Sequence, residues 1–130
     1  MENQGIMLQN EGLKQSIINY KNNTNTSSTN ELTMELMKSS FIIPFIKNNE
    51  KIKYILLKDN NGNLLHPIFT DLNEFAKLDP TLNYRILEFK EYLKILFEVP
   101  ENFNGLIINP KTIAFIIPIE LIINLTKIIP

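Results

Sequence analysis

The segments that decide the fold are EFKEYLKILFE at residues 88–98 and GLIIN at residues 105–109. In the first segment, five apolar side chains recur at spacings i, i+3, i+4, i+7 and i+8, which is typical of a helix with one buried face: Phe89, Tyr92, Leu93, Leu96 and Phe97. The second segment is a short, continuous apolar run, typical of a central strand that is covered on both faces. Together they predict a sheet packed against helices.

Three further strands are predicted before this helix, over residues 41–47 (FIIPFIK), 51–58 (KIKYILLK) and 63–69 (NLLHPIF). The DNNG sequence at 59–62 predicts a tight hairpin turn, because Asn and Gly tolerate positive φ angles. We therefore expect the three strands to form an antiparallel meander. Pro44 lacks a ladder donor, which places it at a sheet edge or a bulge.

Further helices and strands alternate along the rest of the chain. Asp71, with Glu74 three residues on, predicts a helix start with the spacing of a capping box. Short strands are expected over 82–87 and 113–117, and Pro118 is suited to the first position of a last helix. The fold class is therefore α/β (α+β), with a mixed sheet of about five or six strands, an N-terminal antiparallel meander and covering helices.

The N-terminal part differs in composition from the rest. Residues 21–30 (KNNTNTSSTN) contain no apolar side chain, which predicts a flexible linker. Leu13, Ile17 and Ile18 indicate a short amphipathic helix over 11–20. We therefore divide the chain into an N-terminal helix and linker (1–29) and a main domain (30–130), in which a helix capped by Thr29 or Asn30 comes first.

Composition bears on the class of function. The 130-residue chain has 13 Lys+Arg and 14 Asp+Glu, a net charge of −1, which argues against binding to nucleic acid or to an anionic membrane surface. It has no cysteine and one histidine, so neither a metal nor another cofactor is expected. The N-terminus lacks the pattern of a signal peptide, and the apolar run at 115–130 is shorter than a membrane span. We expect a cytoplasmic protein.

Catalytic chemistry has few candidate residues. His66 is the only imidazole and would be the natural general base, with Ser39, Ser40 or Thr70 as a notional nucleophile. No second member of a triad is identifiable, which favours a chain that is not an enzyme. The alternatives are a small hydrolase or transferase that uses His66, and a small-ligand-binding domain without catalysis.

Three short motifs, taken in their order along the chain, resemble those of a known protein family. The first is LMKSSFIIPF at 36–45, which contains Ser39 and Pro44. The second is PIFTD at 67–71, which contains Pro67, Phe69 and Thr70. The third is LIINP at 106–110, which ends in Asn109 and Pro110. Their succession resembles the SseB N-terminal domain family, the enhanced serine sensitivity proteins of bacteria.

This resemblance implies an α/β domain with no established catalytic residue to carry over. It favours a non-catalytic protein–protein interaction or accessory module, in which the motif residues shape the fold. The C-terminal segment contains more apolar residues than one helix face can bury, which predicts a surface for a protein partner or for self-association. The candidate residues of that surface are Ile122, Leu125, Ile128 and Ile129.

Overall fold

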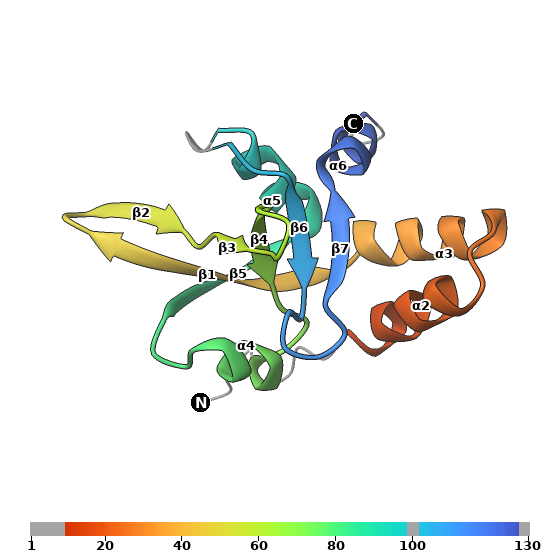
Figure 1. Cartoon of the computed structure of the whole chain (residues 1–130), viewed down its shortest axis with the longest axis horizontal. Coiled ribbons are helices and arrows are strands. Elements are labelled where there is room, and N and C mark those ends of the chain that lie inside the picture. The colour runs from red at the N-terminus through yellow and green to blue at the C-terminus, as the bar shows by residue number, and fades with distance from the viewer. Residues whose placement is uncertain (1–9, 99–101, 128–130) are drawn as a thin grey trace.

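The computed structural model describes residues 10–98 and 102–127. Its helices and strands are interspersed along the chain, and the fold is α+β, as the sequence predicts (Figure 1). In chain order the elements are α2 (Glu11–Asn22), α3 (Thr26–Met37), β1 (Ser40–Asn48), β2 (Lys51–Tyr54), β3 (Leu57–Lys58), β4 (Leu64–Ile68), α4 (Leu72–Leu78), β5 (Asn83–Glu88), α5 (Phe89–Leu96), β6 (Gly105–Ile108), β7 (Phe115–Pro118) and α6 (Ile119–Thr126).

The strands form two sheets rather than one. The first has the order β2-β1-β5 and is antiparallel throughout. The second has the order β3-β4-β6-β7, in which β4 and β6 run parallel and the outer pairs are antiparallel. An isolated bridge between Ile42 and Phe69 connects the two sheets. The predicted mixed arrangement is therefore correct, but it is divided between two sheets.

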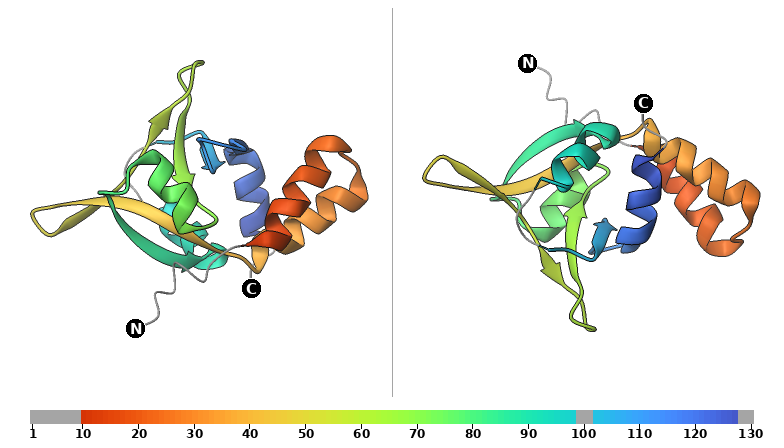
Figure 2. Two further views of the ribbon diagram at one scale, coloured as in Figure 1. Left: turned by 90° about the horizontal axis from the view of Figure 1, so that it is seen from below. Right: turned by 90° about the horizontal axis from the view of Figure 1, so that it is seen from above.

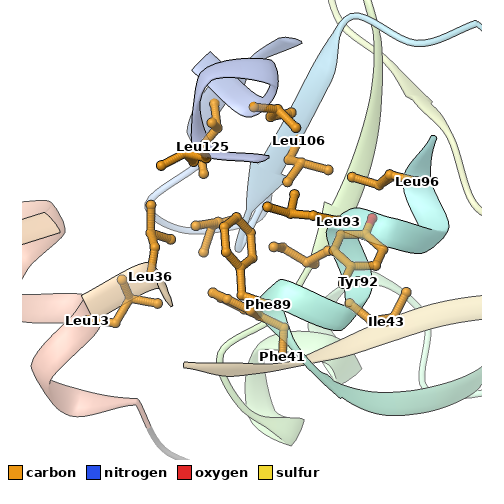
Figure 3. Close-up of a cluster of buried hydrophobic side chains, with 14 of the residues drawn as sticks. Leu13, Leu36, Phe41, Ile43, Phe89, Tyr92, Leu93, Leu96, Leu106 and Leu125 are labelled. Carbon is orange, nitrogen blue, oxygen red and sulfur yellow. The ribbon is translucent and has the colours of Figure 1, made fainter. Parts of the chain in front are cut away.

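The main hydrophobic core lies around α5. The buried face of α5, with Phe89, Tyr92, Leu93 and Leu96, packs against side chains from both sheets and from α2, α3 and α6 (Figure 3). Strand β1 alternates between two clusters, because successive side chains of a strand point to opposite faces. Phe41 and Ile43 belong to the main core. Ile42 belongs to a smaller cluster, with Phe69 and with Phe75 of α4.

The predicted meander is wrong in one respect. Residues 51–58 are not a single strand: β2 ends at Tyr54, β3 begins at Leu57, and the two belong to different sheets. The first hairpin therefore joins β1 to β2 and the second joins β3 to β4. The alternation of apolar and lysine side chains fits either arrangement, so the pattern alone could not reveal the break.

Pro44 lies within β1, which is the central strand of its sheet rather than an edge strand. It pairs with Tyr84 of β5 on one side, whereas the ladder to β2 starts one residue later, at Phe45. The backbone groups of Ile42 bond to Phe69, so alternation turns Pro44 toward that same side. On that side β1 has no paired neighbour at Pro44, which lies between the bridge to Phe69 and the ladder to β2. The absence of an N–H at Pro44 therefore removes no hydrogen bond from either sheet.

The predicted flexible linker over 21–30 is wrong at both ends: α2 extends to Asn22 and α3 begins at Thr26, so only residues 23–25 connect the two helices. Asn25 caps α3: its side chain accepts a hydrogen bond from the Ser28 backbone, and the Ser28 hydroxyl accepts one from the Asn25 backbone. The predicted caps, Thr29 and Asn30, instead lie inside α3. Helices α2 and α3 lie side by side (Figure 2), and their buried leucines belong to the main core.

Two tight backbone features agree with the sequence. Asp59 accepts hydrogen bonds from the backbone of Asn61 and Asn63, and Gly62 has φ 84°, so the predicted hairpin turn at 59–62 is confirmed. At Gly105 a side chain would collide with the backbone of Ile117, so the close approach of β6 and β7 requires glycine. None of the helices in residues 10–98 and 102–127 combines the length and apolar character needed to cross a membrane.

Candidate functional site: a buried polar cluster and a sheet-face groove

A polar cluster lies where the parallel strands β4 and β6 end. The register pairs Ile68 with Ile108, so the residues that follow both strands meet at one edge of the sheet. In α/β sheets this edge is the usual position of a functional site. Three polar residues there are almost fully buried, with exposed fractions of 0 % for Thr70, 4 % for Asp71 and 3 % for Asn109.

Asn109 joins the ends of the two strands through its side chain. Its Oδ1 accepts a hydrogen bond from the Thr70 backbone N–H (3.1 Å), and its Nδ2 donates to Thr70 Oγ1 (3.0 Å). The Asn109 backbone adopts φ 51°, a left-handed conformation that Asn tolerates better than most residues. Its carbonyl accepts from the backbone of Thr112 and Ala114, which turns the chain toward β7.

Asp71 is held by three donors. Its Oδ1 accepts from the Glu74 backbone N–H (3.0 Å), the N-cap bond of α4. Its Oδ2 accepts from Thr70 Oγ1 (3.0 Å) and from Lys14 Nζ of α2 (2.7 Å). Burial alone raises the pKa of this carboxyl, but the hydrogen bonds from Lys14, Glu74 and Thr70 outweigh it, so the pKa is lowered.

The same ion pair acts on Lys14. Partial burial lowers the pKa of its ammonium, but the hydrogen bond and charge of Asp71, with a smaller contribution from Glu11, raise it overall. Both partners are therefore stabilised in their charged forms, and the two shifts agree in direction. The pair fixes the N-terminal half of α2 to the start of α4.

Other bonds extend the cluster to neighbouring segments. Asn10 Nδ2 donates to the carbonyls of Ser40 (2.7 Å) and Thr70 (3.0 Å), which connects the start of α2 to β1. Thr112 Oγ1 donates to Glu74 Oε1 (2.7 Å). Glu74 therefore bonds to the β6–β7 connection and does not complete the capping box that the sequence suggests.

The chemistry of this cluster is that of a structural connector. Both oxygens of the Asp71 carboxylate already accept hydrogen bonds, and the side chain is nearly inaccessible. A general base needs an accessible lone pair close to a substrate. Within residues 10–98 and 102–127, no three His, Cys, Asp or Glu side chains are grouped so that they could hold a metal ion.

The motif residues of the sequence fall around this cluster. Thr70 and Asn109 bond to each other directly, and the backbone of Phe69 exchanges two hydrogen bonds with Ile42 (2.9 and 3.0 Å). Pro67 is buried in β4, and Pro110 follows Asn109 at the surface groove described below. Ser39 lies apart: its hydroxyl donates to the Glu35 carbonyl and closes the end of α3.

His66 lies inside the molecule, with an exposed fraction of 1 %. Its Nδ1 is 2.9 Å from the carbonyl oxygen of Ile55, and its ring packs edge-on against Phe103, with ring centroids 5.0 Å apart. These contacts are those of a histidine that stabilises the β3–β4 region. Its burial does not favour the hypothesis of a catalytic imidazole.

The predicted C-terminal interaction surface is only partly described. Ile122 and Leu125 are 0 % and 4 % exposed and belong to the main core, so they do not form a free surface. The helix α6 turns these two side chains inward, because residues three apart share one helix face. Leu121 and Ile123 are instead the exposed apolar residues of α6. Ile128 and Ile129 lie outside the described residues.

A groove on the second sheet was not predicted. It has a volume of about 320 Å³ and lies on the face of β3, β4 and β6 opposite α5, next to the end of α4. Its floor is apolar and its rim is charged. The lining residues are Leu57, Lys58, Asp59, Leu65, Leu78, Ile107, Pro110 and Lys111. A second hollow, of about 330 Å³, lies at the α2–α3 turn and is lined by Asn, Ser and Glu side chains.

Comparison with known proteins gives no relative. No protein-family model, curated protein or solved structure matches the chain.

Proposed function

We propose that the chain is a non-catalytic protein–protein interaction or accessory module of the SseB N-terminal domain family. The observation that carries the proposal is the groove, an apolar surface on the sheet face that α5 does not cover. Contiguous apolar surface that faces solvent is a feature of protein interaction sites. Leu57, Leu78 and Ile107, all half-buried, line that surface.

The arrangement of the motif residues supports a structural role for them. Thr70, Asp71 and Asn109 direct their polar groups at each other and at the backbone, away from solvent. The residues that carry the family resemblance thus explain how the ends of β4 and β6 are joined. Because these residues are buried, a partner would be recognised by other, exposed residues.

Site-specific photo-crosslinking tests this proposal. A photoreactive amino acid is placed at Ile107 in the groove, at Ile46 on the β1–β2 hairpin and at Ile123 on α6, each in the full chain expressed in its native cells. Lys90, on the exposed side of α5, is the control position. A protein adduct at one or more of the three apolar positions, but not at Lys90, supports an interaction module. The absence of adducts at all three contradicts it.

A small-ligand-binding domain is the second candidate. The groove volume of about 320 Å³ is at the lower end of the range of ligand sites, which span roughly 300–1,000 Å³. A screen of small carboxylates and amphiphiles by NMR chemical shifts tests it. Saturable shifts confined to Leu65, Ile107 and Lys111 favour this candidate over the first.

A further inference from the structure

The chain contains two Asn-Gly pairs, Asn61-Gly62 in the β3–β4 hairpin turn and Asn104-Gly105 where β6 begins. Asparagine is a thermolabile residue. The backbone nitrogen of the next residue can attack its side-chain amide carbon and close a succinimide ring, and glycine obstructs this attack least because it has no side chain. The two pairs are chemically alike, so a large difference in their reactivity must come from the fold.

The fold leaves the Asn61 side chain open to this reaction. Both Asn61 and Gly62 are exposed, and the Asn61 side-chain amide makes no hydrogen bond with the described residues. Gly62 adopts φ 84°, and a Cβ built on it would meet no atom within 4 Å. The Gly62 N–H donates to the Asp59 carbonyl (3.1 Å), inside the turn and outside both strands. The Gly62 nitrogen can therefore leave this bond without the loss of any strand pairing.

The fold protects Asn104 instead. Its Oδ1 accepts a hydrogen bond from the Leu64 N–H (2.8 Å), and its backbone N–H donates to the Leu64 carbonyl (2.7 Å). Its own carbonyl accepts from the Ile119 N–H (2.9 Å). Gly105 is buried in β6, where the backbone of Ile117 leaves no room for a side chain. Ring closure at Asn104 therefore requires this part of the sheet to open.

We propose that Asn61 is a site of spontaneous deamidation. The Gly62 nitrogen loses its proton and forms a bond to Cγ of Asn61, the carbon–nitrogen bond of the side-chain amide breaks, and ammonia leaves with that proton. Water then adds to one of the two carbonyl carbons of the succinimide ring and opens it. One opening yields aspartate, and the other yields isoaspartate, in which the backbone passes through the former side chain.

The modification would act on the turn that closes the β3–β4 hairpin. The Asp59 carboxylate holds this turn by accepting hydrogen bonds from the backbone of Asn61 (2.9 Å) and Asn63 (2.8 Å). A new carboxylate at position 61 repels that of Asp59, and the extra backbone carbon of isoaspartate changes the spacing of the two N–H groups. Because Asp59 also lines the groove, deamidation alters the charge at the border of the groove.

Peptide mapping by mass spectrometry tests the proposal on the full chain. The native protein is kept at mildly alkaline pH, and the deamidated fractions of the peptides that contain Asn61 and Asn104 are followed over time. We expect Asn61 to react about tenfold or more faster than Asn104, because Asn104 reacts only after local opening. In concentrated guanidinium chloride, where neither segment is folded, the two rates should differ by less than about threefold.

Asn61→Gln is the matched variant. Glutamine would have to close a larger ring, so the variant should lose the modification at position 61, whereas the slow reaction of Asn104 stays unchanged. The exposed position makes no side-chain hydrogen bond, so the fold should be retained, which circular dichroism verifies.

Two results would overturn the proposal. In the first, Asn61 of the native protein reacts no faster than Asn104. In the second, the ratio of the two rates is the same in native and denatured protein, which would show that the fold is not its cause. The proposal goes beyond the proposed interaction function, and neither result bears on that function.

Discussion

The side chain of Asn109 hydrogen-bonds to Thr70, 39 residues earlier, through both ends of its amide, at 3.1 and 3.0 Å. This bond pair joins the ends of two parallel strands, beside the backbone hydrogen bond from the Asn109 N–H to the Ile68 carbonyl. It also satisfies a buried backbone N–H, which is costly to leave unpaired.

Asn109→Ala should lower the free energy of unfolding by about 2–4 kcal/mol, because the Thr70 N–H loses its acceptor and alanine is strained at φ 51°. Asn109→Gly loses the same hydrogen bonds but accepts the backbone angle, so it should be about 1 kcal/mol less destabilising. Urea denaturation measures both. Equal losses for the two variants would show that the backbone conformation contributes nothing.

Asp71→Asn tests the ion pair with Lys14 through its pH dependence. The folded-state pKa of Asp71 is lowered, so its stabilising contribution is present above the unfolded pKa of about 4 and is lost as pH falls through the folded pKa. We expect Asp71→Asn to be about 1–3 kcal/mol less stable than wild type at pH 7. The difference should shrink below pH 4.

Urea denaturation at pH 7 and pH 3 measures that difference. Asp59 and Asp79 also have lowered pKa values, from hydrogen bonds to nearby backbone and side chains, but they are present in both proteins and cancel. A stability difference that is the same at both pH values would contradict the assignment of the ionised carboxylate.

Tyr92→Phe should stabilise the protein by about 1 kcal/mol. The Tyr92 hydroxyl is buried and makes no hydrogen bond with the described residues, so folding removes it from water without compensation. Burial, with a smaller effect of Tyr54, raises its pKa well above the ordinary value. Thermal and urea denaturation test this, with Tyr84→Phe, at a half-exposed position, as a control that should change stability by less than about 0.5 kcal/mol.

The β1–β2 hairpin projects from the body of the molecule, and β2 is an edge strand (Figures 1 and 2). Ile46 and Ile52 are exposed there, next to Lys47, Lys51 and Lys53. Charged lysines on an edge strand prevent pairing with another chain. Lys51→Val/Lys53→Val should therefore aggregate at concentrations where wild type does not.

Light scattering measures this aggregation over time. Lys51→Arg/Lys53→Arg keeps both charges and should behave like wild type. If the arginine variant aggregates as the valine variant does, the charges are not what protects the edge.

Local patterns predicted the individual elements well and their assembly less well. The helical spacing around Tyr92 and the turn chemistry at Asp59 depend on nearby residues, so both could be predicted from the sequence. The break between β2 and β3 is decided by which sheet each half joins. That choice depends on contacts between distant segments, which no local pattern contains.

The candidate site shows the same limit. The order of the motifs indicates Thr70 and Asn109, and the capping position indicates Asp71. Neither pattern predicts that the three side chains hydrogen-bond to one another. Lys14 was missed altogether, because it lies in a helix whose sequence indicates only an amphipathic pattern. No local pattern predicts the groove, because its residues come from three strands, one helix and the adjoining turns, and their grouping depends on the register.

The parallel register pairs Leu65 with Gly105, so it closes a loop of about 40 residues that contains α4, β5 and α5. Closing a loop of that length costs more chain entropy than closing either hairpin. The two hairpins should thus form before β4 meets β6, and the Asn109–Thr70 bonds should form after the rate-limiting step. In stopped-flow kinetics, Asn109→Ala would then accelerate unfolding and leave the refolding rate nearly unchanged.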